Sequence, residues 1–385
     1  MSEPTDKLTP TTRRYELDWL RVFGTLAVFF FHCNRIFDHG GWHVKSLEQS
    51  PVSSLFTDFT VQWLMPLFFL VSGASTWFSL SAGETGRFLW ARVRRLVVPL
   101  VFGIFVLIPP QVYLERLNHK EFAGSFLEFY PHYFDGFYGF GGNFAWMGLH
   151  LWYLLALFLF SVISLPLLLW VKRRVHTVFL AGLGSWASRL LGLCLFPVPV
   201  AVLELLLDPR GLGLRDFGGW NLFAYLIFFV TGYLLATDSR FQQSIWRHRQ
   251  LFLGLAVALL AMLLVLRRWE ASVPVVGTVV ATARAFHSWF WLLAMLGFAL
   301  AHLTFSRPWL KRANEAVMPF YILHQTVILL VGYQILKWNA GIFGKFCVIA
   351  TLAFATIVLL YELVIRRVNL LRFLFGMRIK TPEPG

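Results

Sequence analysis

The sequence predicts an all-α, polytopic integral membrane protein of about ten transmembrane helices, with both termini in the cytoplasm. The first observation is composition: 57% of the 385 residues are hydrophobic, the mean hydropathy is +0.64, and only 14% are charged. A soluble domain carries about 25% charged residues. The second observation is a series of long apolar runs, and the third is the uneven distribution of Lys and Arg between them.

Ten apolar runs are candidates for membrane-spanning helices. Most are close to the roughly 20 residues that cross a bilayer as a helix. The third run is short, and the fifth contains Arg189, Pro197 and Pro199, which predicts a kinked or broken helix. The ten predicted spans cover residues 17–37, 55–80, 96–112, 151–171, 178–206, 220–237, 250–268, 284–305, 318–336 and 342–364.

The cationic residues between the spans set the predicted orientation. With the N-terminus inside, the inner segments contain twenty-one Lys and Arg residues and the outer segments contain nine. Cytoplasmic loops carry such an excess. We therefore expect a cytoplasmic N-terminal tail over residues 1–14 and a cytoplasmic C-terminal tail over residues 368–385. No internal repeat or long linker is visible, so residues 1–385 are predicted to form a single membrane domain.

The net charge of +14 does not predict nucleic-acid binding, because the cations flank apolar runs as membrane anchors do. Cys33, Cys194 and Cys347 lie in apolar stretches without a CxxC pair, so neither disulfides nor a metal site are predicted. The first apolar run follows Arg13 and Arg14 as a signal peptide would. It lacks a small-residue cleavage site and similar runs follow, so we expect it to be retained.

The predicted outer loop over residues 113–149 is rich in aromatic side chains. It carries twelve aromatics in 37 residues, and Gly139, Gly141 and Gly142 lie near its end. Long ordered loops are usually functional. Amphipathic rings suit both a membrane interface and the face of a sugar, so both interpretations stay open.

Polar residues inside the predicted spans form an outer layer that centres on His32. Arg21 lies near the inner edge of the first span, and His32 follows eleven residues later on the same face, about 16 Å higher. Asp58 in the second span and His150 at the start of the fourth are expected at the level of His32. His43, in the following outer loop, is expected to approach from above.

The inner layer is predicted to be cationic. Arg92 and Arg95 lie just below the third span, at the cytoplasmic surface, and His324 lies in the inner half of the ninth span, nearer Arg21. Ionisable groups inside a bilayer usually face a protein interior or an aqueous cavity. Arg92 and Arg95 can equally be anchors of the positive-inside kind.

Each of these residues has a functional and a structural interpretation. His32 is either a general base, made more basic by a neighbouring carboxylate, or a hydrogen-bond partner of another helix. Arg21 binds a phosphate, pairs with an acid such as Glu362, or reaches the lipid phosphates. Glu362 and Arg366 form an i, i+4 pair that can be purely structural.

Five segments resemble, in the same order, blocks of the acyltransferase-3 family of bacterial membrane O-acyltransferases: LDWLRVFGTLAVFFFH, MPLFFLVSGAS, RVRRLVVPL, HLWYLLAL and MPFYILHQTV. The resemblance extends from residue 15 to about residue 376. GGWHVKS, FTDF, HLWYLL and the closing YELVIRR and LLRFLFG segments look most like the glucan biosynthesis protein C branch. That branch is associated with the succinylation of periplasmic glucans.

The resemblance implies a catalytic His32 and a donor side at the Arg92 and Arg95 pair. Acyl-CoA would bind from the cytoplasm with its phosphates held by these arginines and Arg21, with His324 also on the donor side. A sugar hydroxyl arriving from outside would lose its proton to His32 and attack the thioester. Direct transfer and an acyl-histidine intermediate both stay open.

Two further roles concern the residues that hold the acceptor and the residue that orients the His32 ring. His43, His150 and Trp152 are expected to hold the acceptor or to stabilise the oxyanion. Many relatives have an acid before the LFF of the second block, where this chain has Pro66. Asp58 lies eight residues earlier, about 12 Å higher and about 80° round a continuous helix. Its depth makes it the expected residue for orienting His32.

The expected function is transfer of an acetyl or succinyl group from cytoplasmic acyl-CoA to a hydroxyl of an exported or periplasmic glycan, in a bacterial inner membrane. We expect no permanently bound cofactor and no metal, with acetyl-CoA or succinyl-CoA as co-substrate. The expected partners are membrane lipid, a carbohydrate acceptor and glycan synthesis or export proteins, and the oligomeric state stays open. The alternatives are a secondary transporter of a small anionic or sugar-like solute, a non-catalytic sensor or scaffold, and acylation of lipopolysaccharide, exopolysaccharide or a lipid-linked sugar.

Overall fold

The computed structural model describes residues 13–81, 83–175, 177–208, 212–266, 269 and 273–380. These residues form helices and connecting turns and contain no β-strand, as the predicted all-α class requires. Of the two predicted tails, residues 1–12 and 381–385 lie outside the described residues.

The helices vary from short turns to rods of 29 residues. Three segments, η1, η2 and η4, are π-helical, and η3 is a 3₁₀-helix. In chain order the elements are α1 (Tyr15–Arg35), α2 (Pro51–Thr60), α3 (Leu64–Ser79), α4 (Thr85–Arg92), η1 (Val93–Val97), α5 (Val98–Phe102), η2 (Gly103–Leu107), α6 (Pro109–Asn118), α7 (Phe126–His132), η3 (Leu149–Leu151), α8 (Trp152–Ile163), α9 (Leu165–Arg174), α10 (Val178–Ala187), α11 (Leu190–Leu195), α12 (Val198–Leu206), α13 (Leu222–Leu235), α14 (Ser239–Arg247), α15 (Arg249–Leu266), α16 (Pro274–His302), α17 (Pro308–Ile335), α18 (Ile342–Leu360), η4 (Tyr361–Ile365) and α19 (Asn369–Leu374).

Within the described ranges, five helices are long and apolar enough to cross a bilayer, and four bent helix pairs raise the number to as many as nine. The sequence predicted ten spans. The first of those, α1, is not among the nine, since Asp18, Arg21 and His32 make it more polar than its neighbours. The predicted break in the fifth span is present as an 82° bend between residues 181–187 and 190–206.

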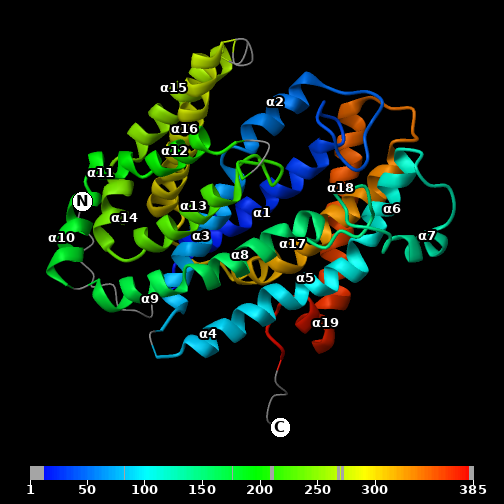
Figure 1. Cartoon of the computed structure of the whole chain (residues 1–385). Helices are drawn as coiled ribbons and strands as arrows, with labels where there is room; N and C mark the ends of the chain where they lie inside the picture. The colour runs from blue at the N-terminus through cyan, green and yellow to red at the C-terminus, as the bar shows by residue number, and fades with distance from the viewer. Residues whose placement is uncertain are drawn as a thin grey trace, which may run out of the picture.

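Helix α1 lies in the middle of the molecule (Figure 1). It packs against α3 on one side and against α17 on the other, and α18 continues the packing beyond α17. Its polar residues are therefore surrounded by other helices. This position gives Arg21 and His32 the protein environment that ionisable groups in a bilayer need.

Helices α3 and α13 cross in very close contact because each contributes a glycine. A Cβ atom on Gly73 would lie 1.8 Å from the carbonyl oxygen of Phe229, and one on Gly232 would lie 1.9 Å from that of Leu70. Small residues of this kind allow helix backbones to approach in membranes. The glycine of the MPLFFLVSGAS segment thus has a packing role at this crossing.

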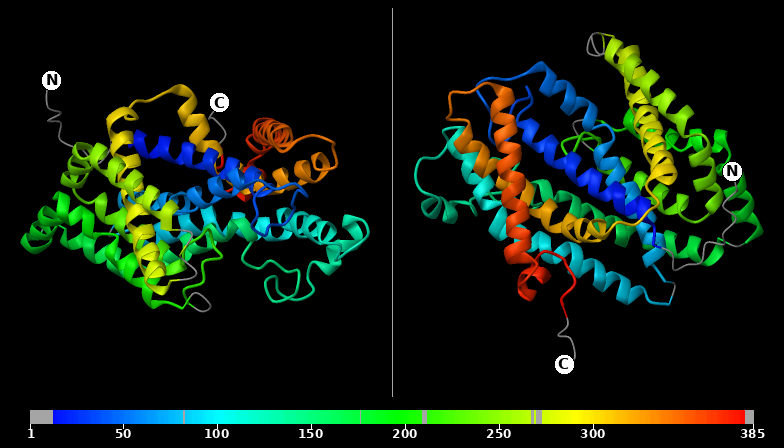
Figure 2. Two further views of the ribbon diagram at one scale, coloured as in Figure 1. Left: turned by 90° about the horizontal axis from the view of Figure 1, so that it is seen from above. Right: turned by 180° about the vertical axis from the view of Figure 1, so that it is seen from behind.

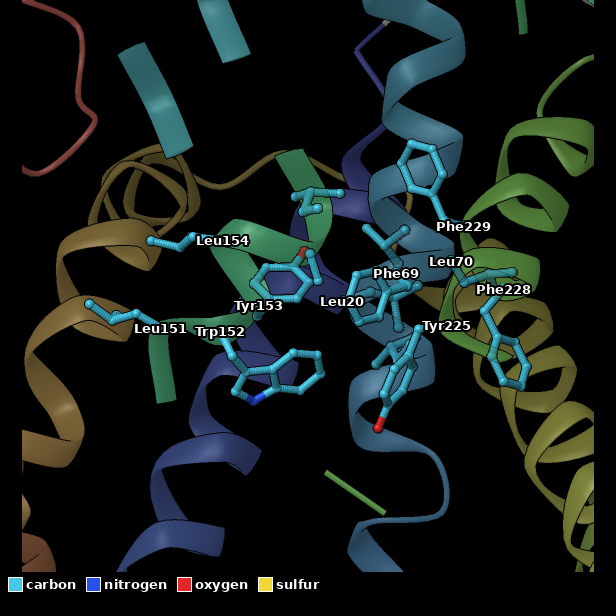
Figure 3. Packing of buried hydrophobic residues seen from close by; sticks show 14 of the residues in the cluster. Leu20, Phe69, Leu70, Leu151, Trp152, Tyr153, Leu154, Tyr225, Phe228 and Phe229 are labelled. Carbon is cyan, nitrogen blue, oxygen red and sulfur yellow. The ribbon is translucent and has the colours of Figure 1, made fainter. Parts of the chain in front are cut away.

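Phe69 of the same segment lies at the centre of an aromatic cluster in the core. Figure 3 shows Phe69 of α3 between Tyr153 of α8 and Tyr225 of α13, and both ring centroids lie 4.9 Å from that of Phe69. Trp152 extends the cluster, 5.4 Å from Tyr225. These contacts fix α8 against α3 and so place its first residues at the functional site.

The second predicted span is interrupted at residues 61–63, between α2 and α3. Pro66 lies in the first turn of α3 and has no N–H to donate to the carbonyl oxygen four residues earlier, that of Gln62. The indole Nε1 of Trp220 donates to that oxygen instead, at 3.2 Å. The angle of 80° between Asp58 and Pro66 assumed one continuous helix, and the interruption removes that assumption.

The aromatic-rich segment over residues 113–149 is partly helical and not a simple loop. It begins inside α6, contains α7, and ends in turns in which Gly139 and Gly141 adopt positive φ angles. Figure 2 places α6 and α7 at one edge of the molecule, with α10 at the opposite edge. The segment therefore covers one end of the structure near the C-terminal end of α1.

Candidate active site

Two cavities of different chemistry lie next to each other along α1. The larger has a volume of about 800 Å³ and contains His32 in its wall, and the smaller has a volume of about 210 Å³ and contains Arg21. Val28, Met65 and Tyr321 line both cavities, so the two spaces adjoin. We call the larger one the histidine cavity, after His32, His43 and His150, and the smaller one the arginine cavity, after Arg21, Arg92 and Arg95.

The arginine cavity concentrates positive charge. Arg21 donates from Nη1 to Oδ1 of Asp18 at 2.7 Å, and Arg92 donates from Nη2 to Oγ1 of Thr76 at 2.6 Å. Arg95 lines the same space, and no Asp or Glu of the described chain lines it with them. Such a group of guanidiniums can bind an anion such as a phosphate or a carboxylate.

The local backbone brings the arginines of two elements into one wall. Arg92 is the last residue of α4, and Arg95 lies in the π-helix η1 that follows directly. Single π turns within helices are frequent at functional sites. Opposite them, Ser75 of α3 accepts a hydrogen bond from Arg21, and the hydroxyls of Ser72 and Tyr153 lie 2.7 Å apart. The serines of the MPLFFLVSGAS segment therefore belong to this cavity.

His32 lines the histidine cavity one helical turn after the shared residue Val28. Its Nδ1 lies 2.9 Å from the carbonyl oxygen of Val28 and 3.1 Å from Nε2 of His324. For Nε2 of His32, the part of the chain that the structure describes supplies no hydrogen-bond partner. The ring is partly exposed to the cavity, so this nitrogen can accept a proton from a group bound there.

His324 lies beside His32 and lines neither cavity among the described residues; the sequence had placed it on the donor side. The difference has a simple cause. The predicted span began at residue 318, whereas α17 begins at Pro308, so His324 is about 24 Å along its helix. His32 is at a similar position along α1, and the two rings meet with centroids 4.8 Å apart.

His150 lies behind His324, with ring centroids 5.0 Å apart, and also lines the histidine cavity. Its Nε2 donates to the carbonyl oxygen of Ile322 at 3.2 Å. On its other side, Nε2 of Gln111 lies 3.4 Å from Nδ1 of His150. The buried amide of Gln111 also accepts a hydrogen bond from Gln325 at 2.9 Å. His150 is thus held at both ring nitrogens.

Asp58 lies near the C-terminal end of α2, and it is absent from the described residues that line the two cavities. The hydrogen-bond partners that the structure gives for the His32 ring are Val28 and His324. The expected pairing of Asp58 with His32 therefore finds no support in the contacts of that ring.

His43 lines the outer part of the histidine cavity with two partners. Its Nδ1 contacts the buried carboxylate of Glu115, and the hydroxyl of Tyr138 donates to the same carboxylate at 2.9 Å. Burial and the Glu115 charge raise the pKa of Tyr138, which keeps its hydroxyl protonated. Trp42 connects this group to the catalytic candidate, with its ring centroid 6.0 Å from that of His32.

The remaining predicted residues fall into two places. Trp152 lines the histidine cavity, and its role on the acceptor side stays a prediction. Glu362 and Arg366 form an ion pair at 2.5 Å at the end of α18 and η4, outside both cavities as the structure describes them. Arg21 pairs with Asp18 and not with Glu362.

A buried polar network at the end of α1 was not predicted from the sequence. The carboxylate of Asp38 accepts hydrogen bonds from Arg35 at 2.5 Å, Lys45 at 2.8 Å and Thr57 at 2.9 Å. Burial lowers the pKa of Lys45, and its hydrogen bond to Asp38 opposes that shift. This network ties the loop after α1 to α2 and fixes one wall of the cavity. The closely spaced charges in residues 35–45 were the available signal.

Comparisons with known proteins identify relatives along nearly the whole chain. The profile of a family described as an acyltransferase domain matches residues 14–362. Proteins named glucans biosynthesis protein C from Salmonella paratyphi B, Salmonella agona and Salmonella enteritidis are each 26% identical to it over 393 residues, which covers 95% of this chain and 95% of each relative. No solved structure matches the chain.

Proposed function

This chain belongs to the acyltransferase-3 family of membrane acyltransferases, and on that premise we propose that it moves a short acyl group from acyl-CoA to a hydroxyl of a glycan, with His32 as the general base. The acyl group is acetyl or succinyl, the donor binds from the cytoplasmic side, and the acceptor is an exported or periplasmic glycan. The membrane is the bacterial inner membrane.

One observation carries the proposal: the arginine cavity adjoins the histidine cavity, and His32 lies in the wall of the latter. In the proposed complex, the phosphates of acyl-CoA bind to Arg21, Arg92 and Arg95, and its pantetheine arm extends past Val28. The thioester then lies beside His32. A separate site for the acceptor is available in the larger cavity.

The chemistry follows from the free ring nitrogen. An acceptor hydroxyl gives its proton to Nε2 of His32 while its oxygen attacks the thioester carbonyl carbon. The C–S bond then breaks, the ester forms, and the CoA thiolate takes up the proton from His32. His43 lines the same cavity and is proposed to hold the acceptor or the oxyanion. His150, whose two ring nitrogens both have partners in the structure, is proposed to form part of the wall against which the acceptor lies.

Two features support a carbohydrate as the acceptor. The histidine cavity is lined by several aromatic rings, including Trp42, Tyr138, Trp146 and Trp152, and such rings suit the apolar faces of sugars. The relatives are named for the biosynthesis of glucans. Family membership favours this reaction over the secondary transport that the intramembrane charges would also permit.

Mass spectrometry of cell-envelope glycans tests the proposal. We expect a mass gain of an acetyl or succinyl group in cells that carry the intact protein, and its absence in cells without it or with His32→Ala. His302→Ala is the matched control, because His302 is an exposed histidine at the end of α16. Uptake of a solute by vesicles lacking any acyl donor, without acylation, would favour transport instead.

A further inference from the structure

We propose that His324 is a positioning residue, which accepts the Nδ1–H of His32 and so leaves Nε2 of His32 as the basic nitrogen. The catalytic role rests on the proposed function. The geometry rests on three contacts: that of His324 with His32, that of His324 with Tyr321, and that of His32 with Val28. Nε2 of His324 lies 3.1 Å from Nδ1 of His32, and the two rings are inclined at 64°. His324 is 1% exposed, so water does not compete for this contact.

A backbone carbonyl determines the tautomer of His324. Its Nδ1 contacts the carbonyl oxygen of Tyr321, three residues earlier in α17. A carbonyl oxygen can only accept, so the proton of the neutral ring must be on Nδ1. Nε2 of His324 then carries a lone pair and faces His32.

A second carbonyl determines the tautomer of His32 in the same way. Its Nδ1 lies 2.9 Å from the carbonyl oxygen of Val28, and that contact also requires a proton on Nδ1. The Nδ1–H is therefore shared between Val28 and the lone pair of His324. The lone pair of the His32 ring is left on Nε2, the nitrogen without a partner in the described chain.

The surroundings of His324 prevent its ring from turning away. His150 packs against it edge-on at 89°, and is itself held by the carbonyl of Ile322 and by Gln111. Tyr321 donates its hydroxyl to the backbone carbonyl of His150, which joins η3 to α17. The three histidines thus pack as one group, and among the hydrogen bonds of the described residues Nε2 of His32 is the ring nitrogen of the group that has no partner.

The hydrogen bond from Nδ1 of His32 to Nε2 of His324 becomes stronger during the reaction. When Nε2 of His32 takes the proton of the acceptor, the ring becomes an imidazolium, and its Nδ1–H becomes a charge-assisted donor to His324. Hydrogen bonds to charged groups contribute more than neutral ones. His324 therefore stabilises the imidazolium that forms on His32 while the proton is being transferred.

Other groups around His32 that carry or can acquire charge come from three elements. Tyr321 and His324 belong to α17, His150 belongs to η3, and Arg35 belongs to α1 itself. His43 and Glu115 lie further out, beyond Trp42. The hydrogen-bond partners that the described residues give to the His32 ring are Val28 and His324, so the neutral His324 takes the position that an acid has in many catalytic pairs.

The test uses full-length protein in lipid nanodiscs and reads His32 directly. Diethyl pyrocarbonate modifies unprotonated imidazole, and peptide mass spectrometry measures the modification of His32 between about pH 5 and pH 9. His324→Leu removes the acceptor, whereas His324→Gln keeps an acceptor oxygen at similar reach. We expect the midpoint for His32 to move to lower pH in His324→Leu and to stay close to that of the unaltered protein in His324→Gln.

The same variants are assayed for CoA release from acetyl-CoA and succinyl-CoA with soluble glucan. We expect a roughly ten- to hundredfold loss in His324→Leu, with the acidic limb of the rate profile moved to lower pH, and recovery in His324→Gln. An unmoved midpoint in His324→Leu, or equal effects of Leu and Gln, would overturn the inference. Absence of CoA release from the unaltered protein would count against the proposed function alone, because the modification profile of His32 would still report on His324.

Discussion

Arg21 and His32 line two different cavities from the same helix, and Val28, which lies between them in α1, lines both. The separation along α1 is about 16 Å, since eleven residues rise by about 1.5 Å each. That distance suits a donor whose charged end and reactive end are far apart. In the proposed function, Arg21 therefore binds the charged end of the donor and His32 lies at its reactive end.

His32→Gln is expected to lower acyl transfer by roughly two to four orders of magnitude, because general base catalysis contributes factors of that size. CoA release, measured with a thiol reagent, checks this. His302→Gln, at an exposed position outside both cavities as described, is expected to retain full activity. Retention of the rate by His32→Gln at equal amounts of folded protein would exclude His32 as the base.

Arg92→Ala and Arg95→Ala are each expected to raise the KM for acyl-CoA about tenfold or more, because each removes a charged donor from the arginine cavity. Arg94→Ala is the matched control, since Arg94 lies over the ring of Phe373 and does not belong to the described lining of that cavity. Titration with CoA at low and at moderate salt separates direct contacts from general attraction. Equal losses in all three variants would indicate a diffuse charge effect.

Gly73→Ala is expected to destabilise the protein by about 2 kcal/mol or more, because its Cβ would overlap the carbonyl oxygen of Phe229 and force α3 and α13 apart. Thermal unfolding in detergent measures the change. Gly254→Ala in α15 is the control, since its Cβ would meet no atom within 4 Å. That control should be neutral or stabilising by about 0.5–1 kcal/mol. A tolerated Gly73→Ala would contradict the close crossing.

Trp220→Phe is expected to destabilise the protein by about 1–3 kcal/mol, because it removes the indole N–H that donates to the carbonyl oxygen of Gln62. Pro66 has no N–H that could take its place. Trp170→Phe, at a residue that is 49% exposed, should have little effect. The same unfolding measurement applies to both. A smaller effect at Trp220 than at Trp170 would show that the interruption between α2 and α3 does not need this bond.

The sequence located the residues whose position depends on spacing along one element. Arg21 and His32 are on one helix, and Arg92 and Arg95 are three residues apart, so their placement follows from helical geometry. The structure brings Arg21, Arg92 and Arg95 together as the depth argument expected.

The depth predicted for a residue is wrong where its helix begins well before the apolar run in the sequence. Apolar composition placed the start of the ninth span at residue 318, but α17 begins ten residues earlier, at Pro308, and His324 therefore reaches His32. At the interruption of the second span by Pro66, the carbonyl oxygen of Gln62 accepts a hydrogen bond from Trp220, which is far away in the sequence. Contacts of this kind, including those of Glu115 with His43 and Tyr138, arise only from the packed helices.

The most direct test of the central claim places the two substrates on opposite sides of one membrane. The protein is reconstituted in sealed vesicles with soluble glucan trapped inside, and acyl-labelled acetyl-CoA or succinyl-CoA is added outside. We expect the trapped glucan to become labelled when the unaltered protein is oriented with its arginine cavity facing the donor. We expect His32→Gln to abolish this label. Label in the glucan with His32→Gln, or label only when both substrates share one side, would contradict the central claim.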